Sequence, residues 1–167
     1  MYIYKQQLSQ LETTVKNTEI SIRNLVPNSA IKQTSSDYGF GLRITTIDLV
    51  AGETYILMGN GRVDQQTLDD GKYLVIYIYE PTWKYVSKNF TIKTLTDSTG
   101  YTLFTPTWTG KYTVASYLSP TGGNRLGKVT TNWVALYKGN VPMGWSPAPE
   151  DQVTTTDFTK KTVEIET

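Results

Sequence analysis

The chain has 167 residues, which suits a single domain with a sizeable core, and its 16 basic residues almost balance its 15 acidic residues. That balance gives no reason to expect a nucleic acid or an anionic membrane as a partner. The chain contains neither cysteine nor histidine, which excludes disulfides, thiol nucleophiles, serine–histidine–aspartate triads and the common zinc sites.

The first 25 residues carry a heptad repeat and contain neither glycine nor proline. One apolar position is filled by Met1, Leu8, Val15 and Ile22, and the other by Tyr4, Leu11, Thr18 and Leu25. This seam predicts a short coiled-coil helix over residues 1–25 that joins copies of the chain. A single amphipathic helix packed on its own domain also fits the pattern. The strict spacing of 3.5 residues favours self-association, and Pro27 ends the helix.

Residues 26–151 predict short strands separated by turns. Their β-branched and aromatic residues suit a pleated sheet: the whole chain has 27 threonines and 12 tyrosines against five alanines. The expected strands are 40–47, 54–58, 73–80, 90–95, 101–104, 111–118 and 133–138. Asn60-Gly61 predicts a hairpin turn, and Asp69-Asp70-Gly71 predicts a turn of unspecified kind. The pattern indicates an antiparallel β-sandwich or barrel. Residues 152–167 are polar and aperiodic, as in a linker or the start of a further shaft.

The strand 73–80 separates cleanly by face. Leu74, Ile76 and Ile78 alternate with tyrosines, so the aliphatic side predicts core and the tyrosine side faces solvent, a groove or a neighbouring subunit. Tyrosine and tryptophan combine an apolar plate with a polar group, which suits sugar stacking and wet protein interfaces. Ordinary cross-strand aromatic pairing on an exposed face explains the same pattern.

Further aromatic and charged residues lie near this strand in the sequence, and together they form a candidate saccharide site. Planar groups would cover the apolar face of a sugar, and charged groups would bind its hydroxyl rim. The predicted plates are Tyr73, Tyr77, Tyr79, Trp83, Tyr85 and Trp108, and the predicted rim is Arg62, Asp64 and Glu80. Trp133 is expected in the core.

Carboxylates are the catalytic resource that remains without histidine and cysteine. A glycosidase needs two carboxyl groups about 5–10 Å apart across one cleft, and no spacing in this sequence marks such a pair. Asp69-Asp70 looks like turn chemistry. The expectation is therefore a protein that is not an enzyme and that uses no cofactor or metal.

Two segments resemble carbohydrate-binding modules of bacteriophage tail proteins. Residues 24–29 (NLVPNS) resemble the opening of those modules. Residues 143–151 (MGWSPAPED), together with 133–140 (WVALYKGN), are similar to their closing stretch. The resemblance spans about residues 24–151, and its specificity lies almost wholly in the C-terminal stretch. Tyr137 stands where the family usually has glutamate, which leaves any role of that carboxylate without a counterpart here.

The resemblance implies a jelly-roll sandwich that binds saccharides without cleaving them. Such modules occur in tail, baseplate and receptor-binding proteins of phages that infect Gram-positive bacteria. Residues 11–19 also look like the trimeric coiled-coil shafts of such fibres. The implied picture is a module embedded in a shaft, with the chain entering and leaving on one side and Trp145 closing the core.

The resulting hypothesis is a fragment of a phage receptor-binding or tail-fibre protein, located at the tail tip and acting at the host cell surface. Its expected partners are host cell-wall polysaccharide, two further copies of the chain and other tail proteins, with no nucleic acid and no membrane. A purely structural or assembly module of a phage tail, whose tyrosine face meets another subunit, is the alternative.

Overall fold

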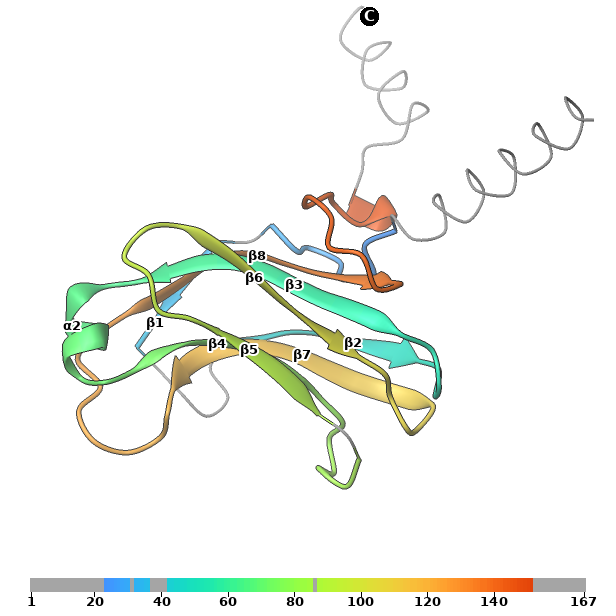
Figure 1. Cartoon of the computed structure of the whole chain (residues 1–167), viewed down its shortest axis with the longest axis horizontal. Coiled ribbons are helices and arrows are strands. Elements are labelled where there is room, and N and C mark those ends of the chain that lie inside the picture. Colours follow the sequence, from blue (N-terminus) through green and yellow to red (C-terminus); the bar gives the residue numbers. More distant parts are fainter. Residues whose placement is uncertain (1–22, 31, 37–41, 86, 152–167) are drawn as a thin grey trace, which may run out of the picture.

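The computed structural model describes residues 23–30, 32–36, 42–85 and 87–151 (Figure 1). Nearly all of the predicted coiled coil and the whole of the predicted linker at 152–167 lie outside these residues. Within them, no helix combines the length and the apolar character that a membrane crossing requires.

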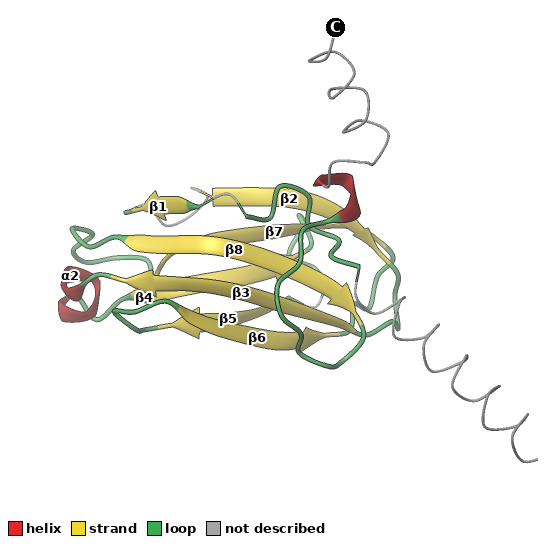
Figure 2. Cartoon of the chain, turned by 90° about the horizontal axis from the view of Figure 1, so that it is seen from above, coloured by secondary structure: helices red, strands yellow, loops and turns green. Residues whose placement is uncertain are grey.

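The described chain is mainly β and forms two antiparallel four-stranded sheets that face each other as a sandwich (Figures 1 and 2). The first sheet has the order β1-β8-β3-β6 and the second the order β2-β7-β4-β5. The strands are β1 (Gln33–Ser35), β2 (Leu42–Leu49), β3 (Tyr55–Val63), β4 (Tyr73–Tyr79), β5 (Lys88–Ile92), β6 (Ser98–Phe104), β7 (Gly110–Ser119) and β8 (Val129–Lys138). Two short helices complete the fold: α2 (Gln65–Asp69) and the 3-10 helix η1 (Pro149–Asp151).

The predicted hairpin turn at Asn60-Gly61 is wrong, because both residues lie inside β3. Gly61 faces the opposite sheet, where a Cβ atom would stand 2.6 Å from Leu74 of β4. The same Cβ atom would also lie 2.3 Å from the carbonyl oxygen of Thr130 on the neighbouring strand β8 of its own sheet. The glycine therefore lets the two sheets approach, a reason for a glycine in a strand that has nothing to do with turning. The turn at Asp69-Asp70-Gly71 is confirmed, with Gly71 in the left-handed region at φ 68°.

The main core lies between the sheets and includes the aliphatic side of β4. Leu74, Ile76 and Ile78 are fully buried, as their alternation predicts. They pack with inward-facing residues of β7 such as Val114 and Leu118 in one continuous cluster. The opposite side of β4 is thereby directed outward, away from the first sheet.

A second apolar cluster lies on the outer face of the first sheet. It is formed by Ile56 and Met58 of β3 with Ala135 and Tyr137 of β8, and residues of the C-terminal segment cover it. Trp133 and Trp145 belong to this cluster and not to the main core, with their rings 6.4 Å apart. The expected core positions of both tryptophans are therefore corrected: Trp133 of β8 and Trp145 of the covering segment are partly buried against each other on the outside of the sheet.

The segments that lead into and out of the sandwich are tied together by buried polar contacts. We refer to residues 23–29 and 143–151 as the clasp. At its centre, Asn24 Oδ1 accepts hydrogen bonds from the N–H groups of Val26 (3.0 Å) and Leu136 (3.1 Å). Asn24 Nδ2 donates to Ser29 Oγ (3.0 Å) and to the carbonyl oxygen of Ser146 (2.8 Å). One buried amide thus joins the incoming segment, β8 and the outgoing segment.

Further contacts place the two ends of the described module side by side. Arg23 forms an ion pair with Glu150, and the N–H of Asn28 donates to Asp151 Oδ2 at 2.6 Å. Tyr137 uses its hydroxyl to accept from the N–H of Ser146 at 3.0 Å. The chain therefore enters and leaves the sandwich at one place.

Replacing Asn24 by alanine tests the clasp. We expect Asn24→Ala to lower the free energy of unfolding by about 3 kcal/mol, because it leaves several buried backbone groups without partners, at about 1–3 kcal/mol each. Chemical denaturation measures this change. Asn140→Ala, at an exposed loop position, should stay within about 0.5 kcal/mol of the parent. Equal denaturation midpoints for the two variants would contradict the importance of this network.

Candidate functional site

The outer face of the second sheet carries a group of aromatic side chains. Tyr77 and Tyr79 point outward from β4, and Tyr117 does so from the neighbouring strand β7, where it pairs with Val75. Trp83 joins them from the loop that follows β4. We call Tyr77, Tyr79, Tyr117 and Trp83 the aromatic face. As the alternation in β4 predicts, these rings lie on the side of the sheet opposite to the core.

Trp83 lies flat against Tyr79. The two ring centroids are 4.3 Å apart and the ring planes differ by 6°. Tyr79 is 5% exposed beneath the indole, whereas Trp83 itself is 52% exposed. One face of the indole is therefore covered and the other is open to solvent. An indole that is held flat with one open face can stack on a second planar or apolar surface.

Tyr77 connects this stack to the rest of the face. Its ring centroid lies 5.6 Å from that of Trp83, 5.8 Å from that of Tyr79 and 6.4 Å from that of Tyr117. Its hydroxyl is 3.1 Å from Ser87 Oγ, and exposed Asn89 of β5 lies opposite it in the ladder. Polar groups thus border the plates on the β5 side.

The loop that presents Trp83 is organised by the carboxylate of Glu80, which is buried. Its oxygens accept hydrogen bonds from the N–H of Thr82 (2.7 Å), the hydroxyl of Thr82 (2.6 Å) and the N–H of Lys84 (3.3 Å). Burial raises the pKa of Glu80, but these hydrogen bonds outweigh burial and hold the pKa below its ordinary value. The carboxylate is therefore ionised at neutral pH, and its oxygens accept hydrogen bonds from residues of its own loop.

Trp83 adopts a backbone conformation that is costly for a bulky residue. Its φ is 58°, in the left-handed region, which costs about 1–2 kcal/mol for a residue with a side chain. The N–H of Trp83 donates to the carbonyl oxygen of Glu80 at 3.0 Å, so the same residue holds the loop through its backbone as well. Strained residues of this kind persist where the surroundings determine them, often at functional positions.

Tyr117 remains a neutral phenol over a wide pH range. Burial, followed by the nearby phenols of Tyr77 and Tyr79, raises its pKa to about 12. Its hydroxyl can therefore both donate and accept a hydrogen bond at neutral pH. The aromatic face as a whole offers phenol hydroxyls and apolar rings, and the nearby carboxylate of Glu80 is hydrogen-bonded within the loop.

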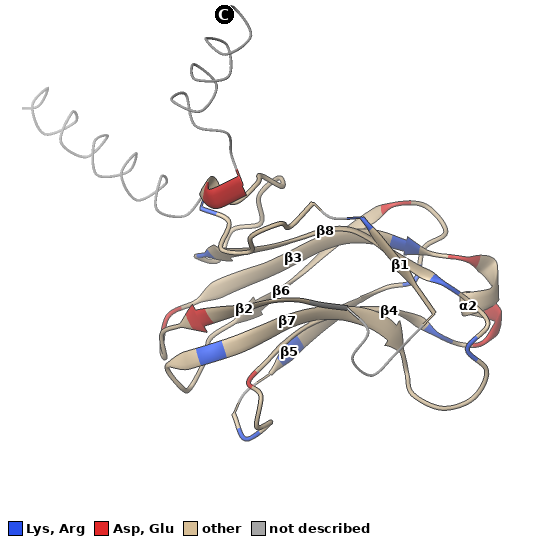
Figure 3. Ribbon diagram, turned by 180° about the vertical axis from the view of Figure 1, so that it is seen from behind, with Lys and Arg blue, Asp and Glu red and all other residues tan. Residues whose placement is uncertain are grey.

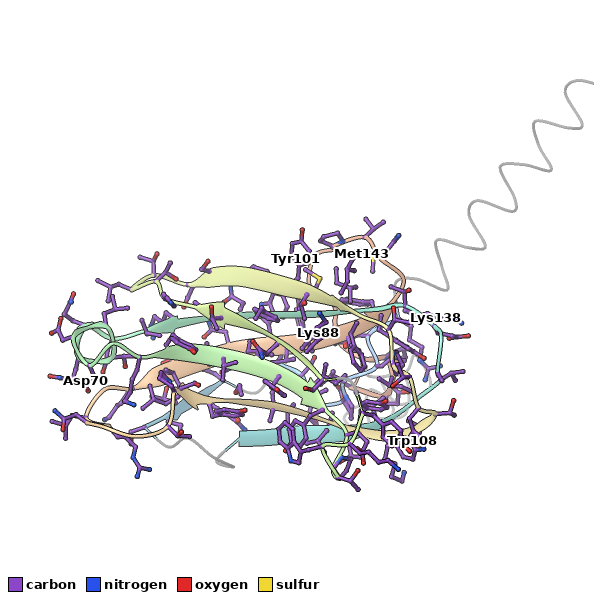
Figure 4. The ribbon with its side chains drawn as sticks, turned by 60° about the horizontal axis from the view of Figure 1, so that its bottom comes forward. Asp70, Lys88, Tyr101, Trp108, Lys138 and Met143 are labelled. Atoms are coloured by element: carbon purple, nitrogen blue, oxygen red, sulfur yellow. The ribbon has the colours of Figure 1, made fainter. Side chains whose placement is uncertain are left out.

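Two other predicted plates form a separate pair at the end of the second sheet. Tyr85 stacks on Trp108 with ring centroids 5.5 Å apart and planes 8° apart. Trp108, labelled in Figure 4, is partly buried and packs against Tyr112 of the main core. Its six-membered ring also fills the space above Gly110, where a Cβ atom would lie 2.0 Å away. Trp108 is therefore held by the core, and Tyr85 is the outer member of the pair.

Tyr73 lies at the beginning of β4, and Trp83 follows the end of that strand. Lys93 Nζ sits 4.8 Å from the centroid of the Tyr73 ring. A cation over an aromatic ring is a favourable contact. The ammonium group of Lys93 therefore covers one face of the Tyr73 ring.

The predicted rim residues are not brought together around the plates. Arg62 belongs to β3 of the first sheet and pairs with Asp97 at 2.8 Å. Asp64 caps α2, where it accepts from the N–H groups of Thr67 (2.8 Å) and Lys128 (2.9 Å). Burial raises the pKa of Asp64, but these hydrogen bonds outweigh it and lower the pKa overall. Both side chains have structural partners on the other side of the sandwich, and Glu80 lies beneath the loop.

The sequence analysis missed Tyr117, Ser87 and Asn89. Tyr117 follows from the alternation of strand 111–118, in which Val114 and Leu118 face the core and Tyr117 faces outward. Ser87 and Asn89 had no comparable signal, because their position beside Tyr77 depends on how β5 pairs with β4. Within the described part of the chain, no three acidic side chains gather as a metal site would require.

No family model matches the chain, and no curated protein matches its sequence significantly. Among solved structures, one described as "Family 16 Carbohydrate Binding Module-2" aligns with 69% of this chain and 74% of its own length. The identity is 13% and the TM-score is 0.39. A likeness at this level does not extend that protein's binding to this chain, so the function has to be argued from the aromatic face.

The loop geometry predicts a pH-dependent effect of Glu80→Gln. The amide nitrogen of glutamine would meet N–H and hydroxyl donors, so the variant should melt at a lower temperature than the parent at pH 7. Because the folded-state pKa of Glu80 is lowered, its ionised form stabilises the fold above the ordinary value of 4.5. That contribution is lost as the pH falls through the lowered folded-state pKa, so the difference in Tm should shrink in acid.

Thermal melts of parent and variant between pH 3 and pH 7 measure this dependence. Asp69→Asn, which removes a carboxylate from an exposed position on α2, should melt like the parent throughout. A difference in Tm between Glu80→Gln and the parent that stays constant down to pH 3 would contradict the proposed role of the carboxylate.

Proposed function

We propose that this protein is a saccharide-binding module that does not cleave its ligand. The observation that carries the proposal is the indole of Trp83, which is stacked on Tyr79 on one side and open on the other. Sugars present apolar C–H faces surrounded by hydroxyl groups. A fixed open indole suits such a face, and the hydroxyls of Tyr77 and Ser87 with the amide of Asn89 suit its rim.

Preorganisation strengthens this proposal. The Glu80 carboxylate holds the loop before any ligand arrives, so little conformational entropy is lost when a ligand stacks on Trp83. An indole that is half exposed contributes little to stability by itself. Maintaining it in a costly left-handed conformation is reasonable where the exposed ring has a binding role.

We further propose that the module belongs to a phage tail-fibre or receptor-binding protein that adsorbs to a Gram-positive cell wall. The support is the resemblance of residues 24–29 and 133–151 to the modules of such proteins. The strand orders β1-β8-β3-β6 and β2-β7-β4-β5 support the jelly-roll arrangement that goes with it. The heptad positions within residues 1–22 support self-association, whereas Leu25, the last predicted seam residue, packs against the main core of the sandwich. The number of three copies is supported by the resemblance of residues 11–19 to trimeric fibre shafts. In this proposal the module acts at the tail tip, at the host cell surface.

A structural or assembly module of a phage tail is the second candidate function. It is favoured by the composition of the aromatic face, since tyrosine and tryptophan are also enriched in protein interfaces. In that case the open face of Trp83 would meet another tail protein. Binding to cells or purified glycans separates the two functions, because an assembly module should bind neither.

Removing the indole should weaken binding strongly, with little effect on stability. We expect Trp83→Ala to lower adsorption to Gram-positive cells and binding to purified cell-wall polysaccharides by at least about tenfold, which is about 1.4 kcal/mol of binding free energy. The free energy of unfolding should fall by only about 1 kcal/mol, the value of an aromatic stack. Whole-cell pull-down and a glycan array measure the first quantity, and chemical denaturation measures the second.

Trp83→Gly provides a sharper version, because glycine also relieves the left-handed conformation. That relief offsets the lost stack, so the variant should be about as stable as the parent and still fail to bind. Leu126→Ala removes another exposed apolar side chain and should leave binding intact. Full binding by Trp83→Gly would show that this surface is not the receptor site. No binding by the parent would favour the assembly function.

The protein should release no sugar from the polysaccharide that it binds. We expect an assay for reducing ends to give the same value with active and with boiled protein, because the loop beside the aromatic face carries, among its described residues, a single carboxylate, that of Glu80, and its oxygens are hydrogen-bonded to its own loop. Asp64→Ala and Glu80→Ala should accordingly change no turnover. Reducing ends above the boiled control would contradict the absence of catalysis.

A further inference from the structure

Apolar side chains cross the outer face of the first sheet in two rows. Each row runs from β8 over β3 to β6, and its three members are direct cross-strand neighbours. The rows are Tyr137, Ile56 and Leu103, and Ala135, Met58 and Tyr101. The apolar surface therefore extends over three strands.

The clasp covers only part of this surface. The N–H of Met143 donates to Met58 Sδ at 3.4 Å, and Trp145 packs on the same cluster. The members of the rows on β3 and β8 are buried as a result. On β6, Tyr101 remains 54% and Leu103 45% exposed. Val141, in the loop between β8 and the clasp, is 65% exposed.

We call Tyr101 and Leu103 the β6 patch. Figure 4 shows Tyr101 near Met143, in agreement with the pairing of Tyr101 with Met58. The patch thus borders the clasp, and the clasp holds the place where the chain enters the sandwich.

The strand that carries the patch has no charge to keep other chains away. β6 contains no charged residue and no proline (Figure 3), and it is the last strand of its sheet. Edge strands in soluble proteins are commonly guarded by lysine, proline or a covering segment. A charge-free apolar surface that includes a tyrosine has the composition of an interface core.

We propose that the β6 patch is the contact surface between copies of this chain. The position of the incoming segment supports this assignment. The 22 residues that precede Arg23 carry most of the heptad seam, and Arg23 is paired with Glu150 in the clasp. Copies that associate through the seam are brought together at the clasp, next to the patch. This inference rests on the self-association proposed above and does not depend on the saccharide site.

The arrangement leaves the saccharide site accessible. The β6 patch and the aromatic face lie on the outer faces of opposite sheets. Copies that meet through the first sheet would direct their aromatic faces outward. Several such faces on one particle can engage one cell wall together, and avidity then exceeds the affinity of a single site.

The test is the oligomeric state of the full chain with Tyr101→Lys and Leu103→Lys combined. Both positions are exposed, so the fold should survive, and circular dichroism and Tm confirm this. Sedimentation velocity over a dilution series should show an oligomer for the parent. The dissociation constant of the double variant should be higher by at least about tenfold, as for loss of a central aromatic contact. Val50→Lys, at a loop position of similar exposure, should behave like the parent.

Two other outcomes would contradict the proposal, and the sedimentation data tell them apart. An oligomeric parent and a double variant with the same dissociation constant would overturn the patch as the contact and leave self-association through the seam standing. The same result is expected if residues 152–167 or an unrelated protein cover the patch. A monomeric parent at micromolar concentration would overturn both self-association and the patch.

Discussion

The geometry of the aromatic face depends on the carboxylate of Glu80. That group accepts hydrogen bonds from Thr82 and Lys84 and thereby fixes the loop after β4. The loop in turn holds Trp83 in a left-handed conformation and flat against Tyr79. A buried ionised group is tolerated because its charge is fully engaged by nearby donors. The acidic residue nearest the plates is therefore a support for the site and is not part of its rim.

The two outer faces of the sandwich are used in different ways. The first sheet is covered along β3 and β8 by the clasp, whose buried Asn24 amide ties both ends of the module to β8. The second sheet directs its aromatic side chains outward, and Trp83 is the exposed member of this group. A module built like this can be attached at one face and bind at the other.

Periodicity in the sequence predicts what depends on neighbours in the chain. The alternation of β4 correctly separates Leu74, Ile76 and Ile78 from the tyrosines, because successive side chains of a strand point to opposite faces. The prediction of a hairpin at Asn60-Gly61 is wrong, because a glycine that lets two sheets approach looks the same in sequence as a glycine that makes a turn. The two kinds of glycine look alike over a short stretch of sequence. Only the presence of an opposing sheet in the folded structure distinguishes them.

The rest of the site depends on tertiary distances that no pattern contains. Arg62 and Asp64 lie close to β4 in sequence, but they belong to the other side of the sandwich. Ser87 and Asn89 reach Tyr77 through the pairing of β5 with β4. Trp133 and Trp145 look like core residues because a clasp over an outer face demands the same apolar residue types as a core.

The central claim is that a saccharide stacks on the open face of Trp83. The chain has four tryptophans, and each gives one indole N–H signal in a two-dimensional nitrogen–proton NMR spectrum. Titration with soluble fragments of purified Gram-positive cell-wall polysaccharides measures which signals move. We expect the Trp83 signal to shift with saturation while the signals of Trp133 and Trp145, on the outer face of the other sheet, stay in place. Shifts at Trp133 or Trp145 with an unmoved Trp83 signal would contradict it.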